Sequence, residues 1–246
     1  MSDLIKKQLK LLRLPVLLES WDTVIKEATQ KNPSYGPFLK EIVSAEFLGK
    51  TQRAKQLRRK KAKIPDHYEM TTYPFHQQPK LNRKQVLEIY DSADYITKLQ
   101  NIALIGPTGV GKTGLATAYL NQAIERGGHG RFILFSDLIM ELYQSVADNS
   151  TKKVLKKFIA YDCLCIDEMG YIEVDNSTQA GLLFKLIRAR KKCTIMTSNL
   201  GFDEWQTFLK SENLTAALLN KFTSNCHLIN MIHCKSITPQ LIPPTK

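Results

Sequence analysis

Five short apolar runs lie between residues 101 and 232, and each is followed by glycine or a polar residue. Short aliphatic runs without polar alternation are typical of strands that are buried on both faces. The segments between them carry apolar residues three and four positions apart, which is the period of an amphipathic helix. The expected strands are residues 101–105, 131–135, 162–166, 193–197 and 227–232. Because helices alternate with these strands, and two of them (136–147 and 151–159) precede the third strand, the pattern predicts an α/β fold with a parallel sheet and helices on both faces.

The first 65 residues are interpreted as helical, with helices expected at 3–13, 16–30 and 37–63. Proline 65 should end the last helix. Further prolines and polar residues then suggest a linker. The expected organisation is a helical N-terminal domain at 1–65, a linker at 66–85, an α/β domain at 86–237 and a tail at 238–246.

A glycine-rich loop follows the first expected strand and precedes an amphipathic helix. Residues 106–113 read GPTGVGKT, which matches the pattern G-x-x-x-x-G-K-[ST] of a P-loop in its required strand–loop–helix context. Glycines allow successive backbone N–H groups to point at phosphate oxygens, and the helix N-terminus adds positive charge. We expect Lys112 to reach the β- and γ-phosphates of a nucleoside triphosphate and the Thr113 hydroxyl to ligate Mg²⁺. The expected nucleotide-binding residues are Gly106, Pro107, Thr108, Gly109, Val110, Gly111, Lys112, Thr113 and Gly114.

Polar residues also end two later strands. Asp167 and Glu168 follow the run 163–166, where α/β sheets place their ligands. Asp167 is expected to hold Mg²⁺, directly or through water, and Glu168 to polarise the attacking water as a general base. Asn199 follows the next strand and is expected to hold the water or the γ-phosphate. The predicted cofactors are therefore ATP and Mg²⁺.

The charge of the chain is concentrated near its start. The net charge is +12, and residues 1–65 contain 15 Lys and Arg against six Asp and Glu. Residues 50–63 hold eight cations and no acid, which favours binding of a polyanion over the alternative of a solvated helix end. A membrane surface fits less well because this segment lacks a broad apolar face. The expected DNA-binding residues are Lys50, Arg53, Lys55, Arg58, Arg59, Lys60, Lys61 and Lys63.

The cysteines and the start of the chain bear on its compartment. Five cysteines are an odd number and three lie in expected strands, which indicates small apolar residues in a reducing compartment. Cys226-His227 and His233-Cys234 raise the alternative of a zinc site, but neighbouring strand residues point to opposite faces, so core packing is expected. No apolar run is long enough to span a bilayer, and residues 1–18 are interpreted as an amphipathic helix rather than a signal peptide, so a cytoplasmic location is expected.

The segments GPTGVGKT, LCIDEMGYIEV, TIMTSNLGFDEW and TAALLNKF, at their spacings, resemble the IstB-like AAA+ ATPases, the helper proteins of insertion-sequence transposition. The resemblance runs from about residue 4 to 237. DnaC, a helicase loader, and DnaA, an initiator, look like more distant relatives. The resemblance implies a five-stranded AAA+ (ASCE) core, in which strand 193–197 lies between the strands that carry Lys112 and Asp167. It places Asn199 beside the γ-phosphate. Because the eleven residues after residue 235 include three prolines, no C-terminal helical lid is expected.

The resemblance also implies an activity and partners. The family implies an ATPase that self-assembles on duplex DNA as a ring or helical filament, with ATP at subunit interfaces, and that delivers a transposase to the DNA. Where the family carries an arginine that reaches a neighbour's ATP, this chain has Lys221, which lacks the planar fork of arginine. Slow hydrolysis, stimulated by DNA and assembly, is therefore expected.

Three functions remain open from the sequence. The first is the DNA-dependent transposition helper, and the second is a DnaC-like loader of a replicative helicase. The third is an adaptor that binds nucleotide without hydrolysing it, against which the position of Glu168 argues. Arg188, Arg190 and the two lysines that follow close a helix, where they either complement its dipole or reach DNA or ATP in another subunit.

Overall fold

The computed structural model describes residues 1–65, 68–171, 174 and 177–237. The chain divides into two compact units, Met1–Leu57 and Arg58–Lys246. The division falls at Leu57 rather than at residue 65, because Ala62 is fully buried in the core of the second unit. Each unit is described by itself.

The first unit is built from helices α1 (Asp3–Leu11), α2 (Pro15–Lys31) and the greater part of α3 (Tyr35–Ala62). Pro15 occupies the first turn of α2, where its missing N–H has no cost. Asn32 ends the same helix in the left-handed conformation. Among the described residues of this unit only Leu9 and Glu46 are buried. The unit therefore has a small core and leaves many apolar side chains on its surface.

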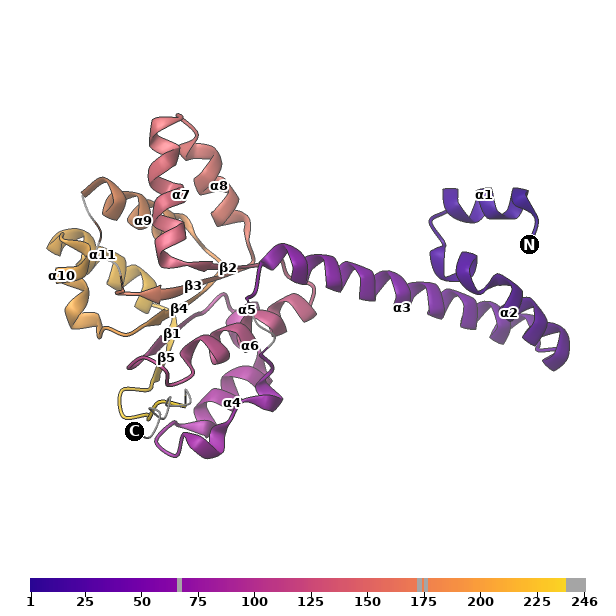
Figure 1. Cartoon of the computed structure of the whole chain (residues 1–246), viewed down its shortest axis with the longest axis horizontal. Coiled ribbons are helices and arrows are strands. Elements are labelled where there is room, and N and C mark those ends of the chain that lie inside the picture. Colours follow the sequence, from indigo (N-terminus) through magenta and orange to yellow (C-terminus); the bar gives the residue numbers. More distant parts are fainter. Residues whose placement is uncertain (66–67, 172–173, 175–176, 238–246) are drawn as a thin grey trace, which may run out of the picture. The chain divides into compact units, whose positions relative to one another are not determined.

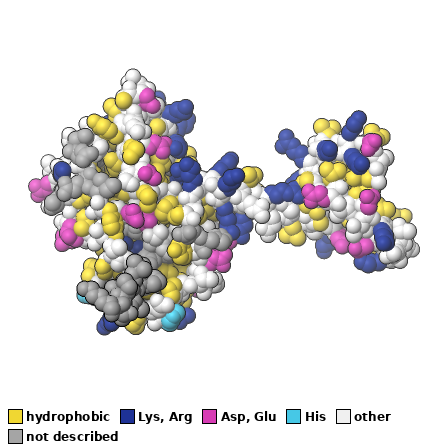
Figure 2. All heavy atoms as spheres, in the orientation of Figure 1, with side chains coloured by type: hydrophobic (Ala, Val, Ile, Leu, Met, Phe, Trp, Pro, Cys, Tyr) yellow, Lys and Arg dark blue, Asp and Glu magenta, His cyan; other side chains and the backbone are white. Residues whose placement is uncertain are grey.

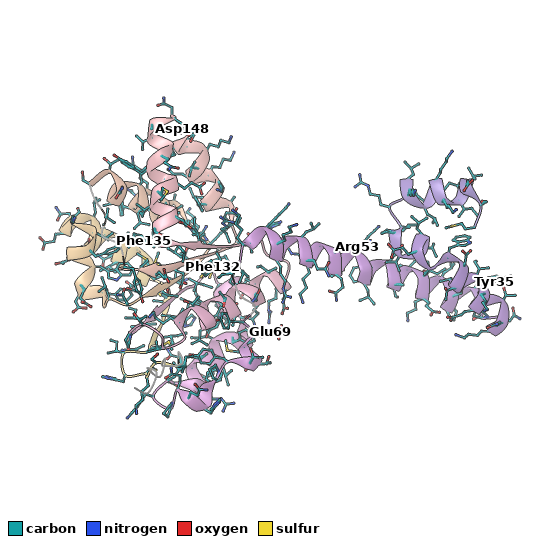
Figure 3. All side chains as sticks on the ribbon, in the orientation of Figure 1. Tyr35, Arg53, Glu69, Phe132, Phe135 and Asp148 are labelled. Carbon is teal, nitrogen blue, oxygen red and sulfur yellow. The ribbon has the colours of Figure 1, made fainter. Side chains whose placement is uncertain are left out.

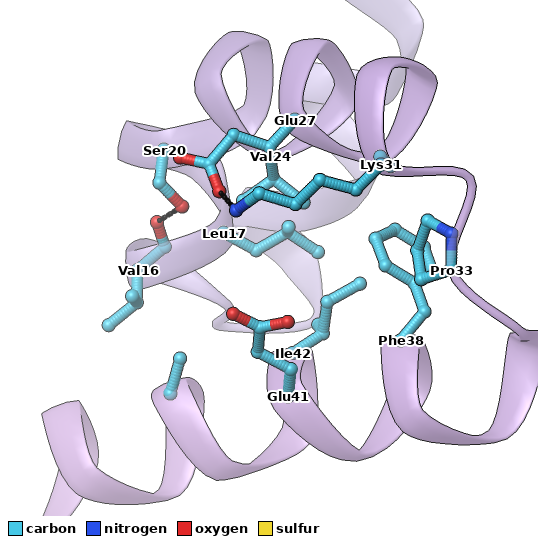
Figure 4. A pocket seen from close by; sticks show the side chains of 12 residues that line it. Val16, Leu17, Ser20, Val24, Glu27, Lys31, Pro33, Phe38, Glu41 and Ile42 are labelled. Atoms are coloured by element: carbon cyan, nitrogen blue, oxygen red, sulfur yellow. Dashed lines mark hydrogen bonds and ion pairs between the residues drawn. The ribbon is translucent and has the colours of Figure 1, made fainter.

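Two contacts fix α2 against α3. The buried carboxylate of Glu46 accepts a hydrogen bond from the backbone N–H of Leu17 (2.7 Å), so an acid on α3 caps the N-terminus of α2. At Gly49 a Cβ atom would lie 2.4 Å from Cγ2 of Val16, so only glycine permits this helix approach. Between the two helices lies a groove of about 200 Å³ (Figure 4). Its walls are mostly apolar, and the ion pair between Lys31 and Glu27 (2.8 Å) borders it.

The second unit contains a parallel five-stranded sheet in the order β2-β3-β4-β1-β5. The strands are β1 (Asn101–Ile105), β2 (Gly130–Leu134), β3 (Cys163–Met169), β4 (Cys193–Ser198) and β5 (Cys226–Asn230). The strand with the expected Asn199 at its end, β4, thus lies between β1 and β3, as expected from the family resemblance. The register of β3 against β4 shifts between Ile166 and Met169, which locally alters the strand that carries the acids.

Helices cover both faces of this sheet (Figure 1). Helix α6 (Lys112–Glu125) packs on one face with α4 (Arg83–Ser92) and α5 (Asp94–Thr97). The opposite face is covered by α7 (Phe135–Ala147), α8 (Thr151–Ala160), α9 (Ser177–Ala189), α10 (Trp205–Leu209) and α11 (Glu212–Thr223). Phe132 on β2 and Phe135 at the start of α7 belong to the cores on opposite faces (Figure 3).

The sequence of the strands explains their burial on both sides. In β1, Ile102 and Leu104 face the α6 side, whereas Ala103 faces the other side. Cys163, Cys165 and Cys193 are all buried on the α6 side as free thiols, so the cysteines in these strands pack as small apolar residues. Cys234 is buried in the same core, and His227 is hydrogen-bonded to Gln100 (2.9 Å). Two of the four residues considered as zinc ligands therefore have structural roles.

The segment expected as a linker is packed onto the second unit. It contains the short 3₁₀ turns Met70–Thr72 and Phe75–Gln77, and a further 3₁₀ turn, Phe202–Glu204, precedes α10. Met70, Tyr73 and Leu81 are buried in the core on the α6 side. The described part of the segment therefore forms a wall of the α/β unit rather than a free connection.

Candidate nucleotide-binding site

The glycine loop joins β1 to α6 at the carboxyl end of the sheet. Gly109 (φ 79°) and Gly111 (φ 93°) adopt the left-handed conformation, which other residues rarely adopt. At Gly106 a Cβ atom would lie 2.7 Å from the backbone of Met231, so glycine also permits the close approach of the chain that leaves β5. Gly111 caps α6 without a side-chain hydrogen bond, which leaves N–H groups of the first turn available to an anion.

Lys112 is 7% exposed and folds into the loop. Its Nζ donates to the carbonyl oxygens of Gly106 (2.7 Å) and Pro107 (2.8 Å). Burial lowers the pKa of Lys112, while the nearby carboxylates of Asp167 and Glu168 oppose that shift. The ammonium group of Lys112 is therefore held near the carboxylates of Asp167 and Glu168, in the loop that is expected to bind phosphate.

Asp167 lies at the centre of a small polar cluster. The Thr113 hydroxyl donates to its carboxylate (2.9 Å to Oδ2), and the Thr197 hydroxyl donates to Oδ1. Asp167 is 2% exposed, and burial raises its pKa despite the opposing effects of these hydroxyls and of Lys112. A buried carboxylate under this penalty is stabilised by any further cation placed beside it.

These two oxygen-bearing side chains fit a magnesium ion. A carboxylate and a hydroxyl in direct contact are hard oxygen donors, and Mg²⁺ in nucleotide sites is held by few protein ligands together with phosphates. Asp167 and Thr113, predicted from separate motifs, are thus brought together by the fold.

Glu168 has an exposed side chain that lines the same cavity. Its backbone has a positive φ of 63°, and its N–H donates to the Thr197 hydroxyl (3.0 Å), so one threonine contacts both the Asp167 carboxylate and the Glu168 backbone. Asn199 lies at the end of β4, and its Oδ1 is buried without a hydrogen-bond partner in the described structure. A Cβ atom at Gly170 would lie 2.6 Å from this oxygen, so Gly170 leaves room for the amide.

A cavity of about 660 Å³ extends from the loop, which is within the range of small-ligand sites. Beyond the expected residues it is lined by Tyr68, Tyr73, Tyr171, Thr197 and Ile237. The Ile237 N–H donates to the Gly109 carbonyl (2.9 Å), and the Tyr73 hydroxyl lies 3.3 Å from the Val110 carbonyl. Sequence reasoning missed these walls, although two tyrosines close together in a supposed linker were a usable signal.

Lys221 lies away from this cavity. It is exposed in the last turn of α11 and lines a different cleft, beside Asn101 and Thr194 at the amino ends of β1 and β4. It cannot reach the nucleotide loop of its own chain, which lies at the opposite end of the strands.

The cations after α9 divide between structural and exposed positions. Arg190 is 4% exposed and donates to the carbonyls of Tyr161 (3.2 Å) and Cys193 (2.6 Å), and to the Thr194 hydroxyl (2.9 Å). Lys192 pairs with Asp162 (2.7 Å). Both residues therefore act within the chain, and not as free cations for a partner.

The eight basic residues expected to bind DNA lie on α3 and directly after it, and are distributed over both units. Lys50, Arg53 and Lys55 belong to the first unit, and the others to the second. Arg59 pairs with Glu125 of α6 (2.9 Å), whereas Lys60, Lys61 and Lys63 are exposed. Figure 2 shows lysine and arginine side chains gathered on the surface around the end of α3.

The strand order, the glycine loop after β1 and the acids that end β3 define a P-loop nucleotide-binding protein with an AAA+-like fold. The family model of the IstB-like ATP binding proteins matches residues 7–238. The chain belongs to this family.

Curated relatives come from insertion sequences. The chain is 32% identical to the ATP-binding protein of insertion sequence IS5376 from Geobacillus stearothermophilus, over 94% of this chain and 92% of that protein. It is 30% identical to the ATP-binding protein of IS21 from Pseudomonas aeruginosa, over 93% and 85% of the two chains.

Solved structures share the fold. The structure of DnaI has a TM-score of 0.56 at 18% identity and covers 67% of this chain and 90% of DnaI. AMPPCP-bound DnaA from Aquifex aeolicus has a TM-score of 0.54 at 16% identity, over 70% and 53% of the two chains. Within the described residues, no helix is long and apolar enough to cross a membrane.

Proposed function

We propose that this protein is a DNA-dependent ATPase that assembles on duplex DNA and recruits a transposase. The observation that carries the ATPase part is the Thr113–Asp167 contact beside Lys112, in a cavity that also exposes the side chain of Glu168. Two insertion-sequence relatives at 30% identity or above support the biological setting.

Hydrolysis requires a base that can reach water in the nucleotide cavity. Glu168 meets this requirement because its carboxylate is exposed to the cavity, whereas that of Asp167 is buried and hydrogen-bonded. Lys112 and the N–H groups of the loop would bind and orient the phosphates. When bound by Thr113 and Asp167, Mg²⁺ would supply neutralisation of phosphate charge.

Binding to DNA is supported by the cations of α3 and by the excess positive charge of the chain. A row of apolar residues on the same helix, Leu39, Val43 and Phe47, is 59–67% exposed, which supports assembly through the first unit. Lys221 and Lys191, exposed at the far end of the sheet, are candidates to approach the nucleotide of a neighbouring subunit.

A helicase loader is the second candidate, because the fold of DnaI is similar. We favour the transposition helper because the insertion-sequence relatives align over nearly the whole chain, including the basic helix. The adaptor without hydrolysis is disfavoured because such a protein has no need of an exposed acid at position 168.

The test is the ATPase activity of the Glu168→Gln variant. We expect turnover, measured with saturating duplex DNA, to fall about 10²–10⁴-fold while ATP binding persists, because only the base is removed. Glu212→Gln, at an exposed position on α11, is the matched control and should leave turnover unchanged. Unchanged turnover in Glu168→Gln would show that the base is assigned incorrectly and would favour the adaptor.

A further inference from the structure

A second pocket lies at the amino end of β2, away from the nucleotide cavity at the carboxyl ends of the strands. It has a volume of about 370 Å³. Its lining comes from the end of α3 and the residue after it, from β2, and from the end of α8. The residues that matter here are Arg58, Lys61, Lys63, Arg131, Lys157 and Tyr161. Five of these six side chains are cationic, and the described lining includes no carboxylate.

Arg131 is the unusual member of this pocket. It is 9% exposed, and its Nε is shielded from solvent without a hydrogen-bond partner. A guanidinium group has five N–H donors, and no hydrogen bond or ion pair of this one is found in the described part of the chain. Burying an unpaired charge is costly, so a buried arginine normally has an anionic partner.

Arg58, which lines the same pocket from α3, repeats this pattern. Its Nε is also shielded and lacks a partner, and no described carboxylate pairs with it. The acids nearby are paired with other cations: Glu125 with Arg59, Asp162 with Lys192 and His129, and Glu141 with Lys157, which itself lines the pocket. Two arginines therefore line one pocket, and no carboxylate of the described residues pairs with either of them.

We propose that this pocket is a phosphate-binding site that takes a phosphodiester group of the DNA backbone. Guanidinium groups bind phosphate oxygens through paired hydrogen bonds, which fits two arginines that line one pocket. The two helices that supply lining residues also carry exposed lysines: Lys60 on α3, and Lys153 and Lys156 on α8. A polymer with many phosphates can contact these lysines while one group enters the pocket, which a free phosphate cannot do.

This proposal rests on the proposed DNA binding and adds Arg131 and Lys157 to its contacts. It predicts that Arg131 is kept for binding at a cost in stability. The Arg131→Met variant should therefore melt about 2–4 °C higher than the wild type, because the unpaired buried charge is replaced by an apolar chain of similar length.

The main test is binding of a fluorescent duplex to the full chain with ATP, from 50 to 200 mM salt. Arg131→Gln should weaken binding about 3–10-fold for any sequence, and should reduce the slope of log affinity against log salt by about 1. Arg126→Gln removes the same charge at an exposed position after α6 and should change neither quantity. Equal behaviour of the two variants would overturn the proposal.

A second arm separates a DNA phosphate from a small anion. Thermal shifts by inorganic pyrophosphate are measured with ADP and Mg²⁺ saturating the nucleotide loop. If the thermal shift requires Arg131, while the slope of log DNA affinity against log salt is the same in the wild type and in Arg131→Gln, the pocket binds a small anion and not DNA. If the wild type bound no duplex but showed that shift, the proposed function would fail while the phosphate pocket stood. If the wild type showed neither duplex binding nor the thermal shift, both the proposed function and the phosphate pocket would be refuted.

Discussion

The buried carboxylate of Asp167 places binding and stability in opposition. Burial raises its pKa, so the charged form is disfavoured in the folded chain relative to the unfolded one. The free energy of unfolding therefore decreases as the pH rises from the ordinary pKa of an aspartate to the raised pKa of Asp167, and it is recovered as the pH falls again. The charge needed to hold a cation is therefore retained at a cost to stability.

We predict that Asp167→Asn raises the melting temperature at neutral pH by about 2–4 °C, and abolishes Mg²⁺-dependent ATP binding. The charge that burial penalises is removed, while the amide oxygen can still accept from Thr113 or Thr197. Calorimetry with and without MgATP measures both effects. Asp203→Asn, at an exposed position, serves as the control. A variant that melted lower than the wild type would contradict this account of the buried charge.

Arg190 shows a second use of a buried charge at the scale of one residue. Its guanidinium joins the ends of α8 and α9 to the start of β4 through several backbone acceptors. The fork geometry of arginine matches these acceptors, whereas a lysine ammonium presents a single centre.

Arg190→Lys should therefore lower the free energy of unfolding by about 2–4 kcal/mol, because buried carbonyls lose their donors. Chemical denaturation followed by circular dichroism measures this change. Arg188→Lys, two residues earlier and exposed, is the same charge-conserving substitution and should leave the free energy of unfolding nearly unchanged. Similar losses in both variants would show that the fork is not what matters.

The residues of the P-loop and the acidic pair could be predicted because their chemistry is local in sequence. Lys112, Thr113, Asp167 and Glu168 each follow from a short motif; the fold places Lys112, Thr113 and Glu168 around one cavity, with Asp167 bonded to Thr113. Thr197 could not be found this way, since its role depends on the neighbouring strand β3 rather than on its own segment.

At the scale of elements, the approach of α2 to α3 depends on a single glycine. Gly49 lies within α3, where glycine normally weakens a helix by about 1 kcal/mol relative to alanine. Its retention there is explained by the contact with Val16, because a Cβ atom at this position would overlap the valine methyl.

Gly49→Ala should destabilise the first unit by about 1–3 kcal/mol despite the better helix propensity, since the overlap forces the helices apart. Hydrogen exchange of α2 amides reports on this unit. The double variant Val16→Ala with Gly49→Ala should recover part of the loss, because the overlapping methyl is removed. Gly36→Ala, near the start of the same helix with no atom within 4 Å, should be neutral or slightly stabilising. Equal effects at positions 36 and 49 would exclude the packing explanation.

The strands were predictable as elements because each is a short run that is buried on both faces. The segment 66–85 was not predictable in the same way. Prolines and polar residues are typical of linkers, and Pro74 and Pro79 lie between the buried residues Tyr73 and Leu81, so no continuous helical pattern includes them. Their burial depends on the face of α6 that they cover.

At the scale of the whole molecule, positive charge and ATP binding should act together. We predict that large assemblies form only with both ATP and duplex DNA, and that DNA affinity falls about 10³–10⁵-fold between 50 and 200 mM salt if six to ten phosphates are contacted. Light scattering with ATP, ADP or no nucleotide measures the assembly. Lys112→Ala should prevent it, because the loop loses its phosphate contact. A monomer that ignores duplex DNA in ATP would favour the helicase-loader function.

The strand order also has a consequence for synthesis of the chain. β2 can pair with β3 soon after both are made, but β1 pairs only with β4 and β5, which come much later in the sequence. A growing chain therefore carries β1 as an unpaired apolar strand while most of the second unit is translated. During this interval the strand is exposed to aggregation or to chaperones. A product that stopped before β4 would contain the whole glycine loop and still be unable to hold it in place.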